Sequence, residues 1–252
     1  MKYLIPFTYL FDTRQRDIIH KISFLLVCYL PSLLFIYFQT AIEINILVTY
    51  TIGFISVYCI YEIGYLFNDI ITIKFENNPT IRWNNDKLKI IEKYLPLIVL
   101  SKVSLLLFFT AFVYHSCNYS NFAIYCICLG ILALFFGLHN VCRCRFNILT
   151  MFIIVSMRYL TLPVLILEKI SIKDFLFLIF LIPVCRTIEY ASKEKYRLFN
   201  KYWNNEMKIR FYYYIFLLLI ISILFVFKYM DLYAIIMTVF FVLLRTFNYF
   251  YK

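Results

Sequence analysis

Long apolar segments alternate with short polar connections along the whole chain. Most of these segments hold about 17 to 23 residues with almost no charge, and at 1.5 Å per residue each is long enough to cross a hydrocarbon core of about 30 Å. The pattern predicts an all-α integral membrane protein, a bundle of about eight (eight to nine) transmembrane helices around a central cavity, forming a single domain over residues 1–252. The predicted helices are Ile22–Gln39, Ile44–Phe67, Leu95–Tyr114, Phe122–Leu138, Ile148–Leu167, Ile172–Ile188, Phe211–Phe227 and Leu232–Tyr249.

The composition agrees with a membrane protein. Apolar residues make up 63% of the chain and charged residues 15%, whereas soluble chains carry about 25% charged residues. This balance excludes a secreted disulfide scaffold and a disordered chain. Most of the cysteines lie inside apolar segments, where Cys acts as a small hydrophobic residue. Cys142 and Cys144, beside His139, are too closely spaced for a zinc knuckle.

Lysine and arginine are concentrated in alternate connections. They are frequent before the first predicted helix and in the second, fourth and sixth connections, whereas Thr40–Glu43 and His115–Asn121 contain none. The positive-inside rule therefore predicts both termini on the cytoplasmic side of a bacterial-type cytoplasmic membrane. The net charge of +11 gathers on that face, where it favours either anionic membrane lipid or a phosphate-bearing substrate. We expect no nucleic-acid partner.

Polar residues that suit a metal–phosphate site follow the second predicted helix. If the helix continues, Asp69, Thr72 and Glu76 share one face next to Asn68, with Tyr65 below them. Such hard oxygen ligands suit Mg²⁺, which binds proteins through one or two carboxylates together with substrate phosphates. Lys74 and Arg82 would then contact the phosphates.

Part of this pattern recurs after the sixth predicted helix. Tyr190 precedes Glu194 by four residues, as Tyr65 precedes Asp69, at an offset of 125 residues or four predicted helices. The two segments are therefore expected to face each other across the bundle. The plainer interpretation is a chance tyrosine and a surface Glu189–Lys193 pair.

Two acidic motifs in these places resemble those of the UbiA-type intramembrane prenyltransferase superfamily. The family's first motif, Asn-Asp-x-x-Asp-x-x-x-Asp, matches Asn68, Asp69, Thr72 and Glu76, and the following segment up to Arg82 is similar to the family's basic stretch. The second motif, Asp-x-x-x-Asp, aligns with Glu194 and Leu198. Arg143 and Arg145 resemble basic residues between the family's fourth and fifth spans. Since Thr72 and Leu198 replace acids, at most three carboxylates remain.

The resemblance implies a Mg²⁺ cofactor and a set of site residues. The implied catalytic residues are Asn68, Asp69, Glu76 and Glu194, and the last three would be metal ligands. The implied substrate-binding residues are Tyr65, Lys74, Arg82, Arg143, Arg145, Tyr190, Lys193, Lys195 and Arg197.

Three functions follow as hypotheses. The leading one is transfer of a polyprenyl group from a polyprenyl diphosphate to an acceptor. The first alternative is phosphoribosyl-type transfer onto polyprenyl phosphate, and the second is a non-catalytic binder or transporter of lipid phosphate. Among ionisable residues in or near the spans, Glu62 and Arg158 are predicted to face a cavity, and Lys102 to extend towards the interface.

Overall fold

The chain folds into helices in a computed structural model that describes residues 2–75, 82–142, 144–193, 196 and 206–250. No strand occurs in these ranges, which confirms the all-α prediction. The α-helices are α1 (Thr8–Thr13), α2 (Ile18–Phe24), α3 (Leu30–Gln39), α4 (Ile44–Ile70), α5 (Asn85–Tyr114), α6 (Tyr119–Val141), α7 (Phe146–Ile166), α8 (Ile172–Ile179), α9 (Cys185–Ala191), α10 (Glu206–Val226) and α11 (Leu232–Phe250). Short 3₁₀ turns cover Lys2–Leu4 and Thr72–Phe75.

Six helical segments in the described ranges are long and apolar enough to cross a membrane. They are Ile18–Gln39, Ile44–Ile70, Asp86–Tyr114, Tyr119–Val141, Phe146–Ile166 and Glu206–Val226. The chain is thus a multi-pass helical membrane protein by length and composition, and the predicted count of eight spans is not confirmed. The helical rod from α8 to α9 contains four charged residues, and the apolar part of α11, Leu232–Phe247, is shorter than the other spans.

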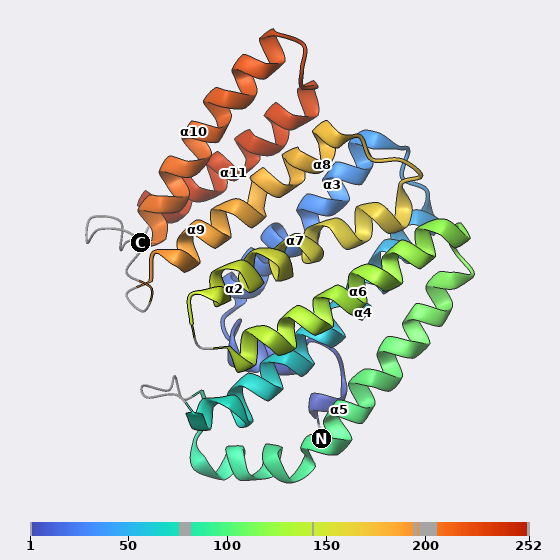
Figure 1. The fold of residues 1–252 in the computed structure, drawn as a ribbon, viewed down its shortest axis with the longest axis vertical. Helices are drawn as coiled ribbons and strands as arrows, with labels where there is room; N and C mark the ends of the chain where they lie inside the picture. The colour runs from blue at the N-terminus through green and yellow to red at the C-terminus, as the bar shows by residue number, and fades with distance from the viewer. Residues whose placement is uncertain (1, 76–81, 143, 194–195, 197–205, 251–252) are drawn as a thin grey trace.

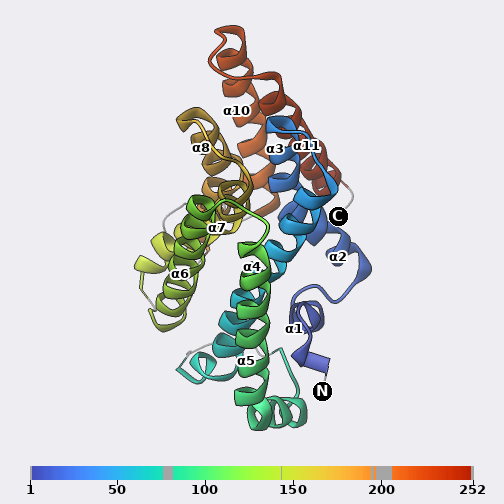
Figure 2. The same ribbon diagram turned by 90° about the vertical axis from the view of Figure 1, so that its right-hand side faces the viewer.

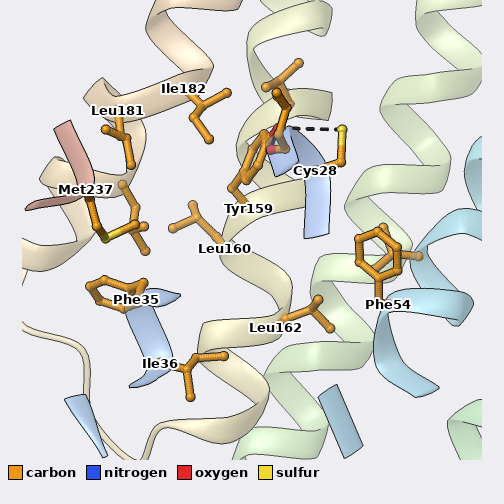
Figure 3. Close-up of a cluster of buried hydrophobic side chains, with 14 of the residues drawn as sticks. Cys28, Phe35, Ile36, Phe54, Tyr159, Leu160, Leu162, Leu181, Ile182 and Met237 are labelled. Atoms are coloured by element: carbon orange, nitrogen blue, oxygen red, sulfur yellow. Dashed lines mark hydrogen bonds between the residues drawn. The ribbon is translucent and has the colours of Figure 1, made fainter. Parts of the chain in front are cut away.

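The helices form an elongated bundle (Figures 1 and 2). The α10–α11 hairpin occupies one end, α5 lies along the other side, and α4, α6 and α7 pack between them. Helix α7 is central because it contacts α3, α4, α6 and α9. Its buried side chains, such as Leu160, pack in a common core with Phe35 of α3, with Leu181 between α8 and α9, and with Met237 of α11 (Figure 3).

Two of the helical segments contain a proline at or next to a π-turn. Pro31 follows a π-turn at Leu25–Tyr29 that joins α2 to α3, and Pro183 lies inside a π-turn at Phe180–Val184 that joins α8 to α9. Because Pro31 has no N–H, it cannot donate to the carbonyl of Val27. The hydroxyl of Tyr159 donates to that carbonyl instead, at 2.9 Å. This hydrogen bond links α7 to the first span.

The N-terminal segment packs into the bundle instead of merely lying against it. Lys2–Leu4 contacts α5, α1 contacts α4, and the side chains of Tyr9 and Leu10 are buried. Phe7, which precedes α1, adopts a left-handed backbone conformation with φ of 68°, and its ring packs against Phe54 and Tyr58 of α4. The segment is therefore in position to supply polar groups to α4 and α5.

Candidate functional site

The carboxylate of Asp69 is the centre of a buried polar cluster at the end of α4. Its Oδ2 accepts hydrogen bonds from the Tyr9 hydroxyl and Arg14 Nη1, both at 2.9 Å. Its Oδ1 accepts from Arg14 Nη2 at 3.0 Å and from Arg82 Nη1 at 2.7 Å. The Asp69 side chain is 1% exposed. One carboxylate is thus held by two guanidinium groups and a phenol.

Electrostatics explain why cations gather here. A negative side chain at the C-terminal end of a helix faces unfavourable backbone carbonyl dipoles, and two arginines offset that cost. Burial, followed by the charge of Asp69, raises the pKa of Tyr9, so its hydroxyl stays protonated and donates. The indole N–H of Trp83 lies 3.4 Å from the same hydroxyl. Three segments distant in sequence are joined at this point.

This geometry bears directly on the predicted metal ligands. Both oxygens of Asp69 already accept two strong donors, and Oδ1 also accepts from the Asn68 amide at 3.2 Å. A metal ion could reach Asp69 only after an arginine moved away. No group of three or more His, Cys, Asp or Glu residues close enough to hold a metal ion occurs in the part of the chain that the structure describes. The other two predicted ligands, Glu76 and Glu194, lie outside that part, so Mg²⁺ remains a prediction.

A pocket of about 470 Å³ lies beside this cluster. Arg82 belongs to both, because it lines the pocket and contacts Asp69. The pocket is lined by Lys2, Phe11, Asp12, Arg16, Lys21, Arg82, Trp83, Asn84 and Lys87. The lining therefore contains five cationic side chains and one carboxylate, that of Asp12, which pairs with Lys2. We name this space the basic pocket; its charge suits an anion such as a phosphate.

The remaining residues predicted around the first motif are placed less centrally. Tyr65 is half-buried, and the Arg14 guanidinium lies 3.7 Å above its ring. Lys74 instead forms an ion pair with Glu92 of α5, where both side chains are exposed. The Thr72 hydroxyl returns to the backbone carbonyl of Asn68. Of the predicted phosphate contacts, only Arg82 reaches the Asp69 cluster.

The second predicted motif meets the C-terminal end of α6. The hydroxyl of Tyr190 lies 3.4 Å from His139 Nε2 and accepts from the Tyr196 hydroxyl at 2.8 Å. The neighbouring residue Asn140 donates to the Gly64 carbonyl of α4 at 2.8 Å. The end of α6 therefore bridges the helices that carry the two motifs. Gly64 permits this approach, because an added Cβ would overlap the ring of Phe136.

Other predicted residues of the second motif are exposed or undescribed. Lys193 is exposed above the Tyr190 ring, and Arg145 is exposed at the start of α7. Arg143, Glu194, Lys195 and Arg197 lie outside the described residues. Whether these cations meet a phosphate therefore stays a prediction.

Glu189 is a buried anion, unlike in the plainer interpretation, which made it half of a surface pair. It does not form the surface pair with Lys193, because Arg186 and Arg210 bind its carboxylate instead. Burial would raise the pKa of Glu189, but these two guanidinium groups outweigh it and lower the pKa to about 2. Glu189 follows the predicted sixth span as Asp69 follows the second. Each of these two helices thus ends with a carboxylate clamped by two arginines.

Glu62 and Lys102 form a fully buried ion pair between α4 and α5. Lys102 Nζ lies 2.6 Å from Glu62 Oε2, and neither side chain is exposed. Lys102 also donates to the Ile5 carbonyl at 2.6 Å, and Glu62 accepts from the Leu10 backbone N–H at 3.0 Å. The predictions that Lys102 extends to the interface and that Glu62 faces a cavity were therefore wrong. The pair anchors the N-terminal segment.

Comparisons with known proteins found no relative. No protein-family model matches the sequence, no curated protein matches it, and no solved structure matches the fold.

Proposed function

We propose that this protein is a membrane-embedded transferase that acts on a polyprenyl phosphate or diphosphate. The observation that carries the proposal is the basic pocket, in which five cationic side chains surround a space of about 470 Å³ beside Asp69. Arginine binds phosphate oxygens through paired N–H groups, and lysine adds point charges. The leading assignment is transfer of the polyprenyl group from its diphosphate to an acceptor.

The position of the pocket favours a lipid over a soluble phosphate. One wall is Lys21 of α2, at the start of the first membrane-length segment. On the same helix Ile18, Ile19 and Ile22 are exposed, each by more than half. An exposed apolar surface of this kind faces lipid in a membrane protein. A lipid chain can therefore run along α2 while its phosphate enters the pocket.

The cations give the pocket a chemical role. When the bond between the prenyl carbon and the diphosphate oxygen breaks, negative charge grows on the departing diphosphate, and preorganised guanidinium and ammonium groups stabilise that charge. A Mg²⁺ ion held by Asp69, Glu76 and Glu194 would add to this neutralisation. Without the metal, Asp69 orients Arg14 and Arg82, and a metal would need one of these arginines to move away.

One observation favours a non-catalytic lipid-phosphate binder as the second candidate. Asp69 is engaged by two arginines and a tyrosine, so the pocket can bind an anion through cations alone, without a metal. A binder needs this recognition and nothing more. The two candidates differ in whether the bound lipid phosphate is chemically changed.

The test is a transfer and binding assay on membranes containing the protein. They are incubated with Mg²⁺ or with EDTA, and with radiolabelled polyprenyl diphosphate or radiolabelled phosphoribosyl diphosphate. We expect transfer from polyprenyl diphosphate, and we expect Arg82→Gln to lower kcat/KM by about 100-fold, which is 2.7 kcal/mol of lost charge stabilisation. The control is Lys173→Gln, because Lys173 is exposed and paired with Asp231 away from the pocket; its activity should equal the parent's.

Each other outcome selects a different conclusion. Binding of polyprenyl diphosphate without transfer favours the binder. Transfer from phosphoribosyl diphosphate into lipid contradicts the leading assignment and favours the ribosyl alternative. If Arg82→Gln and Lys173→Gln both behave like the parent, the basic pocket is not the site.

We further propose that the chain crosses the membrane eight times, around a central cavity, with both termini cytoplasmic. The motivation is the absence of Lys and Arg from Thr40–Glu43 and His115–Asn121. With Asn118→Cys in a Cys117→Ser background, a membrane-impermeant maleimide should label residue 118 in intact cells. Native Cys144, which is exposed between α6 and α7, should react only after permeabilisation. The reverse result would invert the topology.

A further inference from the structure

Arg158 places a positive charge in the middle of a membrane-length helix. It lies at the thirteenth position of the 21-residue helix α7, which is one of the six segments able to span a membrane. Ionisable groups at such depths are costly and tend to face partners or cavities. The Arg158 charge therefore needs a partner that neutralises it.

Aromatic rings and a thiol surround the Arg158 guanidinium, and no carboxylate does. Its central carbon lies 4.1 Å from the ring centre of Tyr61 and 5.9 Å from that of Tyr58. Its Nη1 lies 3.7 Å from Cys28 Sγ. Within the described ranges no acid lies within ion-pair distance of it. Stacking on aromatic rings contributes about 0.5–2 kcal/mol, which falls short of the several kcal/mol that desolvating a guanidinium costs.

Two hydrogen-bond donors at this place have no acceptor among the described residues. They are Arg158 Nε and the Tyr58 hydroxyl, and both atoms are buried. The neighbouring tyrosines are different: Tyr61 donates to the Ile154 carbonyl at 3.0 Å, and Tyr159, drawn in Figure 3 beside Cys28, donates to that of Val27. Buried donors are normally satisfied, so two unsatisfied donors beside a charge indicate an acceptor that the described residues do not supply.

We propose that Arg158 and Tyr58 form an oxyanion-binding site inside the bundle. The ligand class is an amphipathic molecule with an apolar body and one carboxylate or phosphate group. Two oxygens of such a group can accept from the guanidinium, and one of them can also accept from the Tyr58 hydroxyl. Residue Arg158 is only partly buried, whereas Tyr58 and Tyr61 are buried, so a ligand would approach the site from the Arg158 side.

This site is separate from the basic pocket. Tyr58, Tyr61 and Tyr65 share one face of α4 that ends at Asp69, which lies eleven positions, or about 16 Å, further along the helix than Tyr58. Arg14 covers Tyr65 at one end of this face and Arg158 covers Tyr61 at the other. The two cationic places are connected by aromatic rings but do not share a residue.

Thermal unfolding of the purified full-length protein in a neutral detergent tests the proposal. The probes are decanoate and decyl phosphate, which separate the two anion types, with decanol as the neutral counterpart. We expect at least one anion to raise the Tm of the parent saturably while decanol does not. Arg158→Met and Tyr58→Phe should weaken its apparent affinity, the former by at least about tenfold, as expected for lost charge-assisted hydrogen bonds.

Three controls keep the result specific. Tyr125→Phe removes another buried hydroxyl without a described partner, and it should leave the affinity unchanged. Arg16→Gln with Lys87→Gln removes cations from the basic pocket, which can itself bind decyl phosphate, and in this background the part of the Tm shift that depends on Arg158 should be retained. Arg158→Met is expected to fold, since no acid loses its partner, and Arg158→Lys provides a second charged variant. Equal Tm shifts in the parent and Arg158→Met, or no shift with either anion in the parent, would overturn the proposal.

Discussion

Replacing Lys102 with methionine should destabilise the protein by about 3–5 kcal/mol. The substitution leaves the carboxylate of Glu62 fully buried with the Leu10 N–H as its one remaining partner among the described residues, and breaking one side of a buried ion pair typically costs that much. It also removes the donor to the Ile5 carbonyl, so the N-terminal segment should loosen. The free energy of unfolding can be measured by SDS titration in mixed micelles.

The matched controls isolate the unpaired charge. Lys89→Met removes an exposed lysine from the same helix, and its effect should stay within about 0.5 kcal/mol. The double variant with Lys102→Met and Glu62→Gln removes both charges and should recover most of the lost stability. A single variant as stable as the parent would show that Glu62 and Lys102 are not paired in the membrane.

The apolar pattern predicted where helices lie better than what they contact. Predicted span Ile44–Phe67 corresponds to α4, which begins at the same residue and ends three residues later, at Ile70. Helix α5 begins at Asn85, ten residues before the predicted start at Leu95. The prediction missed this part because Asn85–Tyr94 is polar although it is helical, and because the helix continues through Pro96. Length and apolarity are local properties, so a sequence window records them.

The partners of the site residues are not local. Asp69 was identified as a site residue, but its bidentate partner Arg14 is 55 residues away, before the first predicted helix. The sequence marked Glu62 and Lys102 as costly inside a membrane, yet only the packing of α4 on α5 pairs them. Charged residues in apolar helices were the available signal, and matching opposite charges on consecutive spans could have found this pair.

Asp69→Asn should lower the free energy of unfolding by about 2–3 kcal/mol. The change leaves Arg14 and Arg82 facing each other without the carboxylate, and hydrogen bonds to charged groups contribute about 1.5–3 kcal/mol each. The expected loss is below the full sum because the two arginine side chains are 16% and 27% exposed and can turn towards water. Asp12→Asn is the control, since Asp12 lines the same pocket but pairs with a largely exposed lysine, and its loss should stay under about 1 kcal/mol.

Measuring the same variants with and without Mg²⁺ separates the two roles available to Asp69. If Asp69 orients the arginines, Asp69→Asn loses stability equally in EDTA and in Mg²⁺, because the lost partners are guanidinium groups. If Asp69 is a metal ligand, the variant should resemble the parent in EDTA and lose only the stabilisation that Mg²⁺ gives the parent. The contacts of Asp69 with Arg14, Arg82 and Tyr9 favour the first outcome. If Asp69→Asn is as stable as the parent in EDTA, Asp69 does not hold the two arginines, and a role as metal ligand is favoured.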